Sequence, residues 1–356
     1  MSDLGSTADV DRVAVALGLV GGLALFLFAL DELARTLKEA AGDRMRNWLA
    51  RAAGTPLRGL AAGTGATVAL DSSTATIVML IAFVDAGLLT AAQALPVVLG
   101  ANVGTTVSTQ ILAAGLDDLA PLLFALALAA QVALRSPAAK RYARIAAMLS
   151  LLLFALNLMG RAMEPLAGNL AVADWLGGLD NPAVALAVGA GVTVALQSSS
   201  ATMGLVIALA STGALPLTGA LGVMLGAEIG TCADTLIAAL GRSAAAVRVG
   251  LFHLVFNVAS AGLALLFLDH LAFFARWSAP DVAGQVANAQ VAFNLVGVAA
   301  AMLLLAAVRT RPTTGGALAA VQPADARAIT SDRRADAAAV AGGLVEPLPR
   351  ELTHGE

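Results

Sequence analysis

The sequence is poor in charged residues, aromatic residues and cysteine. Only 13% of its 356 residues are charged, whereas a soluble domain carries about 25%, so the chain has too few to cover a surface in water. Cys232 is the only cysteine, which excludes an intrachain disulfide, and with three histidines it leaves almost no ligands for a zinc site. Because no basic stripe is interleaved with aromatic residues, we do not expect nucleic acid as a partner.

Hydrophobic residues, by contrast, make up 59% of the chain. They form continuous runs instead of the alternating pattern of barrel strands. The 35 glycines, together with many alanines, would allow helices to approach closely within a bilayer. These features predict an all-α integral membrane protein.

The chain contains an internal repeat. When it is shifted by 126 residues, the stretch Leu60 to Gly115 aligns without a gap with Leu186 to Gly241, and 28 of the 56 positions are identical. This identity is too high for shared apolar composition alone, so we infer a duplication.

The apolar runs and the charges beside them predict the topology. About seven runs are long enough to cross a core of about 30 Å, namely 12–33, 92–114, 119–134, 145–163, 217–240, 248–268 and 286–308. Lys and Arg crowd the segments 34–58 and 135–144 and follow the last run, and such segments face the cytoplasm. Successive loops then lie on alternate sides of the membrane if 57–90 and 183–215 are re-entrant hairpins, each of which enters and leaves the membrane on the same side.

Three crossings in each repeat would invert the second copy relative to the first. We therefore expect a first inverted repeat at 1–140, a second at 141–270, a final span at 285–309 and a disordered cytoplasmic tail at 310–356.

The two hairpins indicate a binding site near the middle of the membrane. Each has two short apolar arms that meet at a polar cluster, and short, broken segments in corresponding places of inverted halves are typical of substrate sites. A helix that begins there presents unpaired N–H groups and a positive dipole end, to which serine hydroxyls add donors. The candidate anion-binding residues are Ser72, Ser73, Gln197, Ser198 and Ser199.

Oxygen-rich side chains in and beside the same motifs are candidates for binding a monovalent cation, since hard cations prefer oxygen ligands. The repeated motif GANVGTT at 100–106 and GAEIGTC at 226–232 contributes several of them. Its glycines also have the GxxxG spacing of closely packed helices, which is the alternative explanation for them. The full set of cation candidates is Asp71, Thr74, Ser200, Asn102, Thr105, Glu228 and Thr231.

Three stretches, QSSSAT at 197–202, GANVGTT at 100–106 and HLVFN at 253–257, resemble the sodium/phosphate cotransporter family. The resemblance covers roughly residues 15–308. It implies sodium-driven symport of inorganic phosphate across the cytoplasmic (inner) membrane, with both hairpins crossing near its middle and with Na⁺ as the coupling ion. No other cofactor is expected. Phosphate, Na⁺ and the lipid bilayer are the expected partners, together with a second copy of the chain in a homodimer.

The sequence departs from the family pattern at two places where a neutral amide is usual. Asp71 replaces Gln in the first hairpin, and Glu228 replaces Asn in the second half. Intramembrane carboxylates are costly and are functional candidates by default. They leave open another small anion, proton coupling or a non-transporting regulatory role. An enzyme is not expected, because no GxSxG serine elbow is present. Because the sequence has no ATP-binding P-loop, an ion gradient is expected to drive transport.

Overall fold

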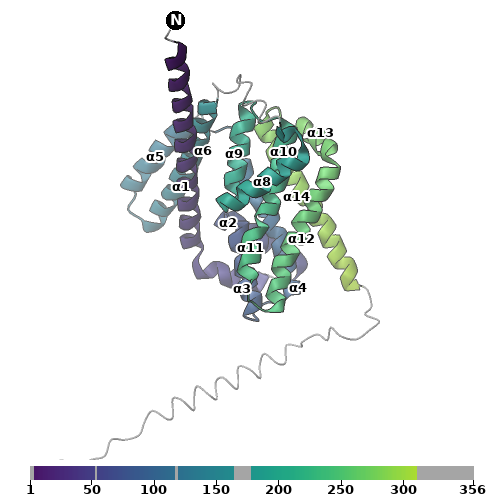
Figure 1. Ribbon diagram of the computed structural model, residues 1–356. Coiled ribbons are helices and arrows are strands. Elements are labelled where there is room, and N and C mark those ends of the chain that lie inside the picture. Colours follow the sequence, from purple (N-terminus) through teal and green to yellow (C-terminus); the bar gives the residue numbers. More distant parts are fainter. Residues whose placement is uncertain (1–3, 53, 117–118, 164–177, 311–356) are drawn as a thin grey trace, which may run out of the picture. The chain divides into compact units, whose positions relative to one another are not determined.

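The computed structural model describes residues 4–52, 54–116, 119–163 and 178–310, and within these ranges the secondary structure is helical, without strands (Figure 1). The chain divides into two compact units, 1–305 and 306–356. The predicted tail lies outside the described residues from position 311 onward.

Within the described ranges, the first half contains two long helices and three short ones. A long first helix is followed by a broken pair, a span-length helix and a short helix, and their bounds are α1 Leu4–Ala52, α2 Pro56–Leu70, α3 Ser73–Asp85, α4 Ala91–Leu112 and α5 Ala120–Ala133. The second half begins with a long helix and again contains a broken pair, and its elements are α6 Pro137–Met163, η3 Gly178–Asp180, α8 Pro182–Leu196, α9 Ser199–Ser211, α10 Leu217–Gly230, α11 Cys232–Ala239, α12 Ala244–Leu266, α13 Leu268–Ser278 and α14 Val282–Thr310.

In the described part of the chain, six segments are long and apolar enough to cross a membrane, one fewer than the seven predicted. The run at 119–134 forms α5, whose 14 residues reach only about 21 Å at 1.5 Å per residue. The segment Leu217–Ala239 counts as one span, although it is interrupted at Thr231 between α10 and α11. The sequence reading also missed α13, which follows α12 directly.

The duplication inferred from the sequence is visible in the helix bounds. Adding the offset of 126 residues to the bounds of α2 gives the bounds of α8. Adding it to the bounds of α3 gives the bounds of α9. The helix α4 likewise corresponds to the pair α10 and α11. Both copies therefore fold locally in the same way, while the inversion of one copy relative to the other stays a prediction.

Glycines bring the broken helices into backbone contact with their neighbours. A Cβ atom on Gly100 of α4 would overlap the carbonyl oxygen of Leu60 in α2, and one on Gly226 of α10 would overlap that of Leu186 in α8. The glycines of the repeated GANVGTT and GAEIGTC motifs thus serve close helix packing, as GxxxG spacing predicts. This packing holds the first arm of each broken pair against α4 or α10.

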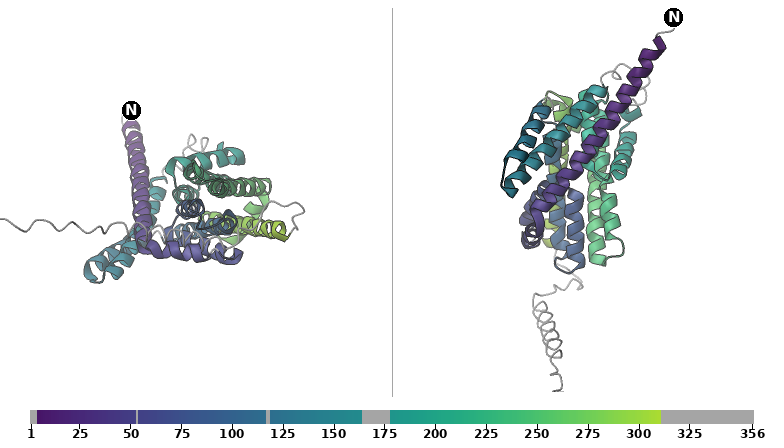
Figure 2. Two further views of the ribbon diagram at one scale, coloured as in Figure 1. Left: turned by 90° about the horizontal axis from the view of Figure 1, so that it is seen from below. Right: turned by 90° about the vertical axis from the view of Figure 1, so that its left-hand side faces the viewer.

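Polar contacts tie other elements together. The helices α1 and α6 lie side by side (Figure 2), and Arg144 pairs across them with Glu32 at 2.9 Å. At the end of α3, Asp85 accepts a hydrogen bond of 2.8 Å from the backbone N–H of Ser243 in the second half. That hydrogen bond, together with nearby Arg242, holds the pKa of Asp85 below its usual value. Asp85 therefore links the first broken pair to the loop before α12.

Replacing Gly100 by Ala should destabilise the protein, because the new methyl group has no space beside the Leu60 carbonyl. Overpacking of this kind costs roughly 1–3 kcal/mol. We expect a lower midpoint of thermal unfolding in detergent for Gly100→Ala. The control is Gly262→Ala, where no neighbouring atom lies within 4 Å of the new methyl group. Equal midpoints for both variants would contradict the proposed packing role of Gly100.

Candidate functional site

Each broken helix pair is interrupted at one residue with a left-handed backbone conformation. Asp71 has a φ of 48° between α2 and α3, and Gln197 has a φ of 52° between α8 and α9. Among the described residues these are the only non-glycine positions with positive φ. A side chain there costs energy relative to glycine, and such positions cluster at functional sites. Their occurrence at equivalent places of the repeat marks both breaks as candidate sites.

The residue after each break caps the helix that follows. Ser72 accepts a hydrogen bond of 3.1 Å from the N–H of Ala75 at the start of α3, and Ser198 accepts one of 3.1 Å from Ala201 at the start of α9. Ser is a preferred N-cap because its oxygen satisfies an N–H of the first turn. Since each hydroxyl acts as an acceptor in its cap, its own hydrogen is left to donate elsewhere.

Buried threonine pairs hold the two arms of each break together. Thr67 of α2 donates to Thr76 of α3 at 3.1 Å, and the equivalent pair, Thr193 and Thr202, lies at 2.8 Å. All four side chains are at most 1% exposed. The same hydrogen bond, repeated in both halves, fixes the geometry of each loop.

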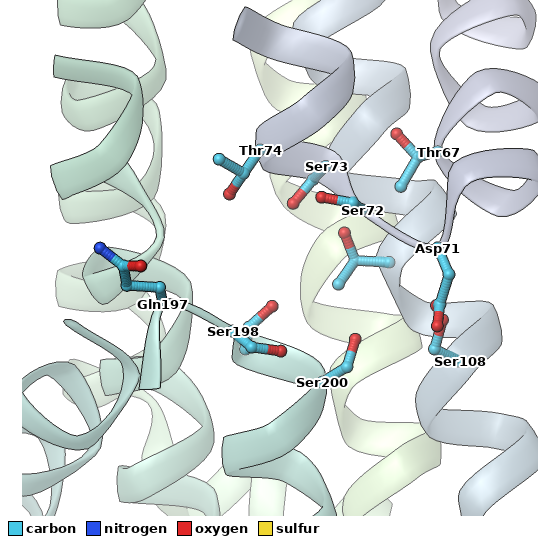
Figure 3. A pocket seen from close by; sticks show the side chains of 11 residues that line it. Thr67, Asp71, Ser72, Ser73, Thr74, Ser108, Gln197, Ser198 and Ser200 are labelled. Atoms are coloured by element: carbon cyan, nitrogen blue, oxygen red, sulfur yellow. The ribbon is translucent and has the colours of Figure 1, made fainter. Parts of the chain in front are cut away.

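The two loops face one small cavity, shown in Figure 3 with Thr74, Ser73 and Ser72 on one side and Gln197, Ser198 and Ser200 on the other. Its volume is about 40 Å³, above the 10–15 Å³ or so that a single water molecule needs. Every residue that lines it carries a hydroxyl, carboxyl or amide group, and these residues are Thr67, Asp71, Ser72, Ser73, Thr74, Thr105, Ser108, Gln197, Ser198, Ser199 and Ser200.

The cavity combines two positive helix ends with one carboxylate and no Lys or Arg. The first turns of α3 and α9 both begin there, so their dipoles favour negative charge in the cavity. Ser73 and Thr74 have backbone N–H groups without an acceptor in the part of the chain that the structure describes. Such N–H groups, with the neighbouring hydroxyls, are the donors of an anion site. Asp71 adds oxygen atoms that can bind a cation.

The structure brings together nine of the predicted site residues and adds two that the sequence reading missed, Thr67 and Ser108. Ser108 donates a hydrogen bond to Asp71, and the two side chains point toward each other in Figure 3. Helical spacing gave a usable signal, because Ser108 lies one turn after the predicted Thr105 and Thr67 lies one turn before Asp71.

Three predicted cation ligands do not line this cavity. Asn102 is buried and donates to the Val98 carbonyl at 3.1 Å within its own helix. Thr231 donates to the backbone oxygen of Glu228 at 2.8 Å. The Glu228 side chain instead accepts hydrogen bonds from α14. Their role in cation binding stays a prediction, and it would have to be exerted from outside the central cavity.

Six segments of membrane-spanning length make this a multi-pass membrane protein. Broken helices that meet at a polar cavity inside a helical bundle are typical of secondary transporters. The family described as Na⁺/Pi-cotransporter matches the chain twice, over residues 25–161 and 151–305, which is once for each half. The chain therefore belongs to the Na⁺/Pi-cotransporter family, a family of phosphate transporters.

Relatives agree with this membership. The chain is 30% identical over 272 residues to a Bacillus subtilis protein named "Uncharacterized protein YqeW", covering 76% of this chain and 88% of the relative. It is 29% identical to the "Putative inorganic phosphate export protein YjbB" of Escherichia coli K12, covering 72% of this chain but only 47% of that protein. It is 41% identical over 98 residues to human "Sodium-dependent phosphate transport protein 2C", covering 26% of this chain and 15% of the relative. No solved structure matches the chain.

Cysteines placed on the two loops should be linked by a short reagent, because both loops line one small cavity. We expect Ser72→Cys combined with Ser198→Cys to be joined by a short bifunctional methanethiosulfonate, detected as a mass increase with loss of both free thiols. Native Cys232 is fully buried and should not react. The control pair combines Ser72→Cys with Ser278→Cys, which does not line the cavity. Linking of both pairs, or of neither, would contradict the arrangement.

Proposed function

We propose that this chain carries out sodium-coupled symport of inorganic phosphate across the cytoplasmic membrane, with the phosphate bound in the central cavity. One observation carries the proposal: the start of a helix from each half opens into a single cavity that is lined only by polar residues. Membership of a phosphate transporter family supports the choice of anion.

The donors around the cavity suit a small oxyanion. The hydroxyl hydrogens of Ser72 and Ser198 are not used by their caps, so each can donate to a phosphate oxygen. The backbone N–H groups of Ser73 and Thr74 can do the same at the first turn of α3, and Gln197 offers an amide. Hydrogen bonds to a charged partner are the strong ones, so phosphate can be held here without a lysine or arginine.

The cation would bind beside the phosphate. Asp71, Thr74, Thr105 and Ser200 all line the cavity and offer oxygen ligands of the kind that hard cations prefer. A cation next to a bound anion offsets part of the cost of placing either charge inside the membrane. Each ion would thus favour binding of the other, which is the thermodynamic basis of coupled transport.

Alternating access would come from movement of one half against the other. We propose that residues 1–140 and 141–270 are inverted repeats, with 57–90 and 183–215 as re-entrant hairpins and 285–309 as a final span. The matching helix bounds of the two halves support the repeat, and the basic segments support a cytoplasmic C-terminus. In such a design the site stays fixed while its exposure changes sides.

Removing both capping hydroxyls should greatly weaken phosphate transport in proteoliposomes. Ser72→Ala and Ser198→Ala should each raise the KM for phosphate by about 10-fold to 100-fold, because a hydrogen bond to a charged group contributes roughly 1.5–3 kcal/mol. The double variant should be inactive. The measurement is uptake of labelled phosphate driven by a sodium gradient.

A matched control separates the anion contact from loss of a cap. Ser243 caps α12 through the N–H of Ala246 but does not line the cavity, so Ser243→Ala should transport with a KM close to that of the parent protein. Transport by the double variant at the parent rate would refute the cavity as the phosphate site.

Asp71 supports a second candidate, a proton-coupled transporter of the same anion. A carboxylate lines the cavity where the family pattern has an amide, and it can carry a proton as well as bind Na⁺. If Asp71 binds the coupling cation, Asp71→Asn should change the dependence of uptake on Na⁺ or on pH, measured with the two varied independently. An unchanged profile would show that Asp71 plays no part in coupling. Because one relative is named for phosphate export, efflux from loaded vesicles should be recorded in the same preparation.

A further inference from the structure

A second polar cluster lies buried outside the central cavity. It draws on three elements of the second half, and none of its residues lines that cavity. Its side chains are between 0% and 3% exposed, and they are Glu228 of α10, His253 and Asn257 of α12, and Gln290 and Asn294 of α14. So many fully buried polar groups inside a membrane protein call for a physical explanation.

Glu228 contacts both neighbouring helices of this cluster. Cys232 links it to α12, because its thiol lies 3.6 Å from the backbone oxygen of Glu228 and accepts a hydrogen bond of 3.3 Å from Nδ2 of Asn257. The Oε1 atom of Glu228 accepts a hydrogen bond of 2.8 Å from Nε2 of Gln290 and one of 3.1 Å from Nδ2 of Asn294. Among the described residues no Lys or Arg forms an ion pair with it. Two neutral amides do not balance the charge of a buried carboxylate, which is costly to bury without a partner of opposite sign.

The cluster also contains four buried atoms that have no hydrogen-bond partner within the described residues. They are Oε1 of Gln290, Oδ1 of Asn294, Oδ1 of Asn257 and Nε2 of His253. The three amide oxygens are acceptors only. Two of them belong to the amides of Gln290 and Asn294, whose nitrogen atoms already donate to the Glu228 carboxylate.

The histidine nitrogen is an acceptor as well. Thr235 donates its only hydroxyl hydrogen to the Cys232 carbonyl at 2.9 Å. If Thr235 keeps that hydrogen bond, its contact of 3.0 Å with Nδ1 of His253 is made by the tautomer that carries its hydrogen on Nδ1. In the neutral ring this leaves Nε2 as a bare acceptor.

We propose that Glu228, Gln290, Asn294 and Asn257 form a binding site for one monovalent alkali cation, separate from the central cavity. Each unpartnered atom here, like the carboxylate, needs a positive or hydrogen-donating guest, and oxygen ligands suit a hard cation. One carboxylate balances one positive charge, whereas a divalent ion would leave a net charge buried. Rotation of the side-chain amides of Gln290 and Asn294 would point their oxygen atoms, instead of their N–H₂ groups, toward Glu228 and complete the ligand shell.

Sodium should stabilise the protein through this site, and Asp71→Asn can first remove the carboxylate of the central cavity. In detergent, replacing choline chloride by NaCl at constant ionic strength should raise the unfolding midpoint of Asp71→Asn by at least about 2 °C. Adding Glu228→Gln should abolish that rise while keeping a cooperative transition. The proposal concerns binding alone and does not depend on phosphate transport.

A second pair of variants tests the amide ligands, and it also tests the proposal if Glu228→Gln does not fold. In the Asp71→Asn protein, Gln290→Met should raise the Na⁺ concentration that gives half of the rise by about 10-fold or more. The matched control is Gln285→Met on the same helix, whose amide donates to the Ala279 carbonyl outside the cluster, and it should leave this concentration unchanged.

Three results would overturn the proposal. The first is a Na⁺-dependent rise of the unfolding midpoint that persists when Glu228→Gln is added. The second is a rise that Asp71→Asn alone removes. That result would assign the cation to the central cavity and support the proposed function. The third is a midpoint that responds to pH but not to Na⁺, which would show that Glu228 holds a proton, with His253 and Cys232 as the neighbouring titratable groups.

Discussion

The requirement that buried backbone groups find a partner governs this structure. In a bilayer, helices can be broken only where protein or a water-filled cavity satisfies the exposed N–H and C=O groups. At both breaks a serine cap satisfies one N–H of the first turn and a buried threonine pair ties the arms together. The N–H groups that remain, such as those of Ser73 and Thr74, open into the cavity. The donors that the fold leaves without a partner are therefore the ones available to an anion.

Close packing is what makes this arrangement possible. Gly100 and Gly226 let α4 and α10 touch the backbone of the broken pair beside each of them, so backbone contacts add to the side-chain packing that holds the first arm of each pair. The glycines of the repeated motif thus act on the site through position, whereas neighbouring Thr105 acts on it directly.

The sequence predicted those parts of the fold that follow from local chemistry. The offset of 126 residues, the breaks near Asp71 and Gln197, and nine residues of the cavity could all be read from repeated polar clusters in apolar surroundings. Contacts that depend on how helices rotate against each other could not. Ser108 shares a helix with the predicted Thr105, but only packing decides that it meets Asp71. The short helix α5 was taken for a full span because apolar composition does not reveal where a helix ends.

The two halves share a backbone design but not a charge distribution. Asp71 in the first half corresponds to the neutral Gln197 in the second, while Glu228 in the second half corresponds to the neutral Asn102 in the first. These two carboxylates therefore lie at different places of the repeat: Asp71 lines the central cavity, and Glu228 faces α14. A transporter with fully equivalent halves would have the same energy with its site open to either side. In the transport cycle proposed above, unequal carboxylates would remove that equivalence, so that a cation or a proton bound at either one would favour one side over the other.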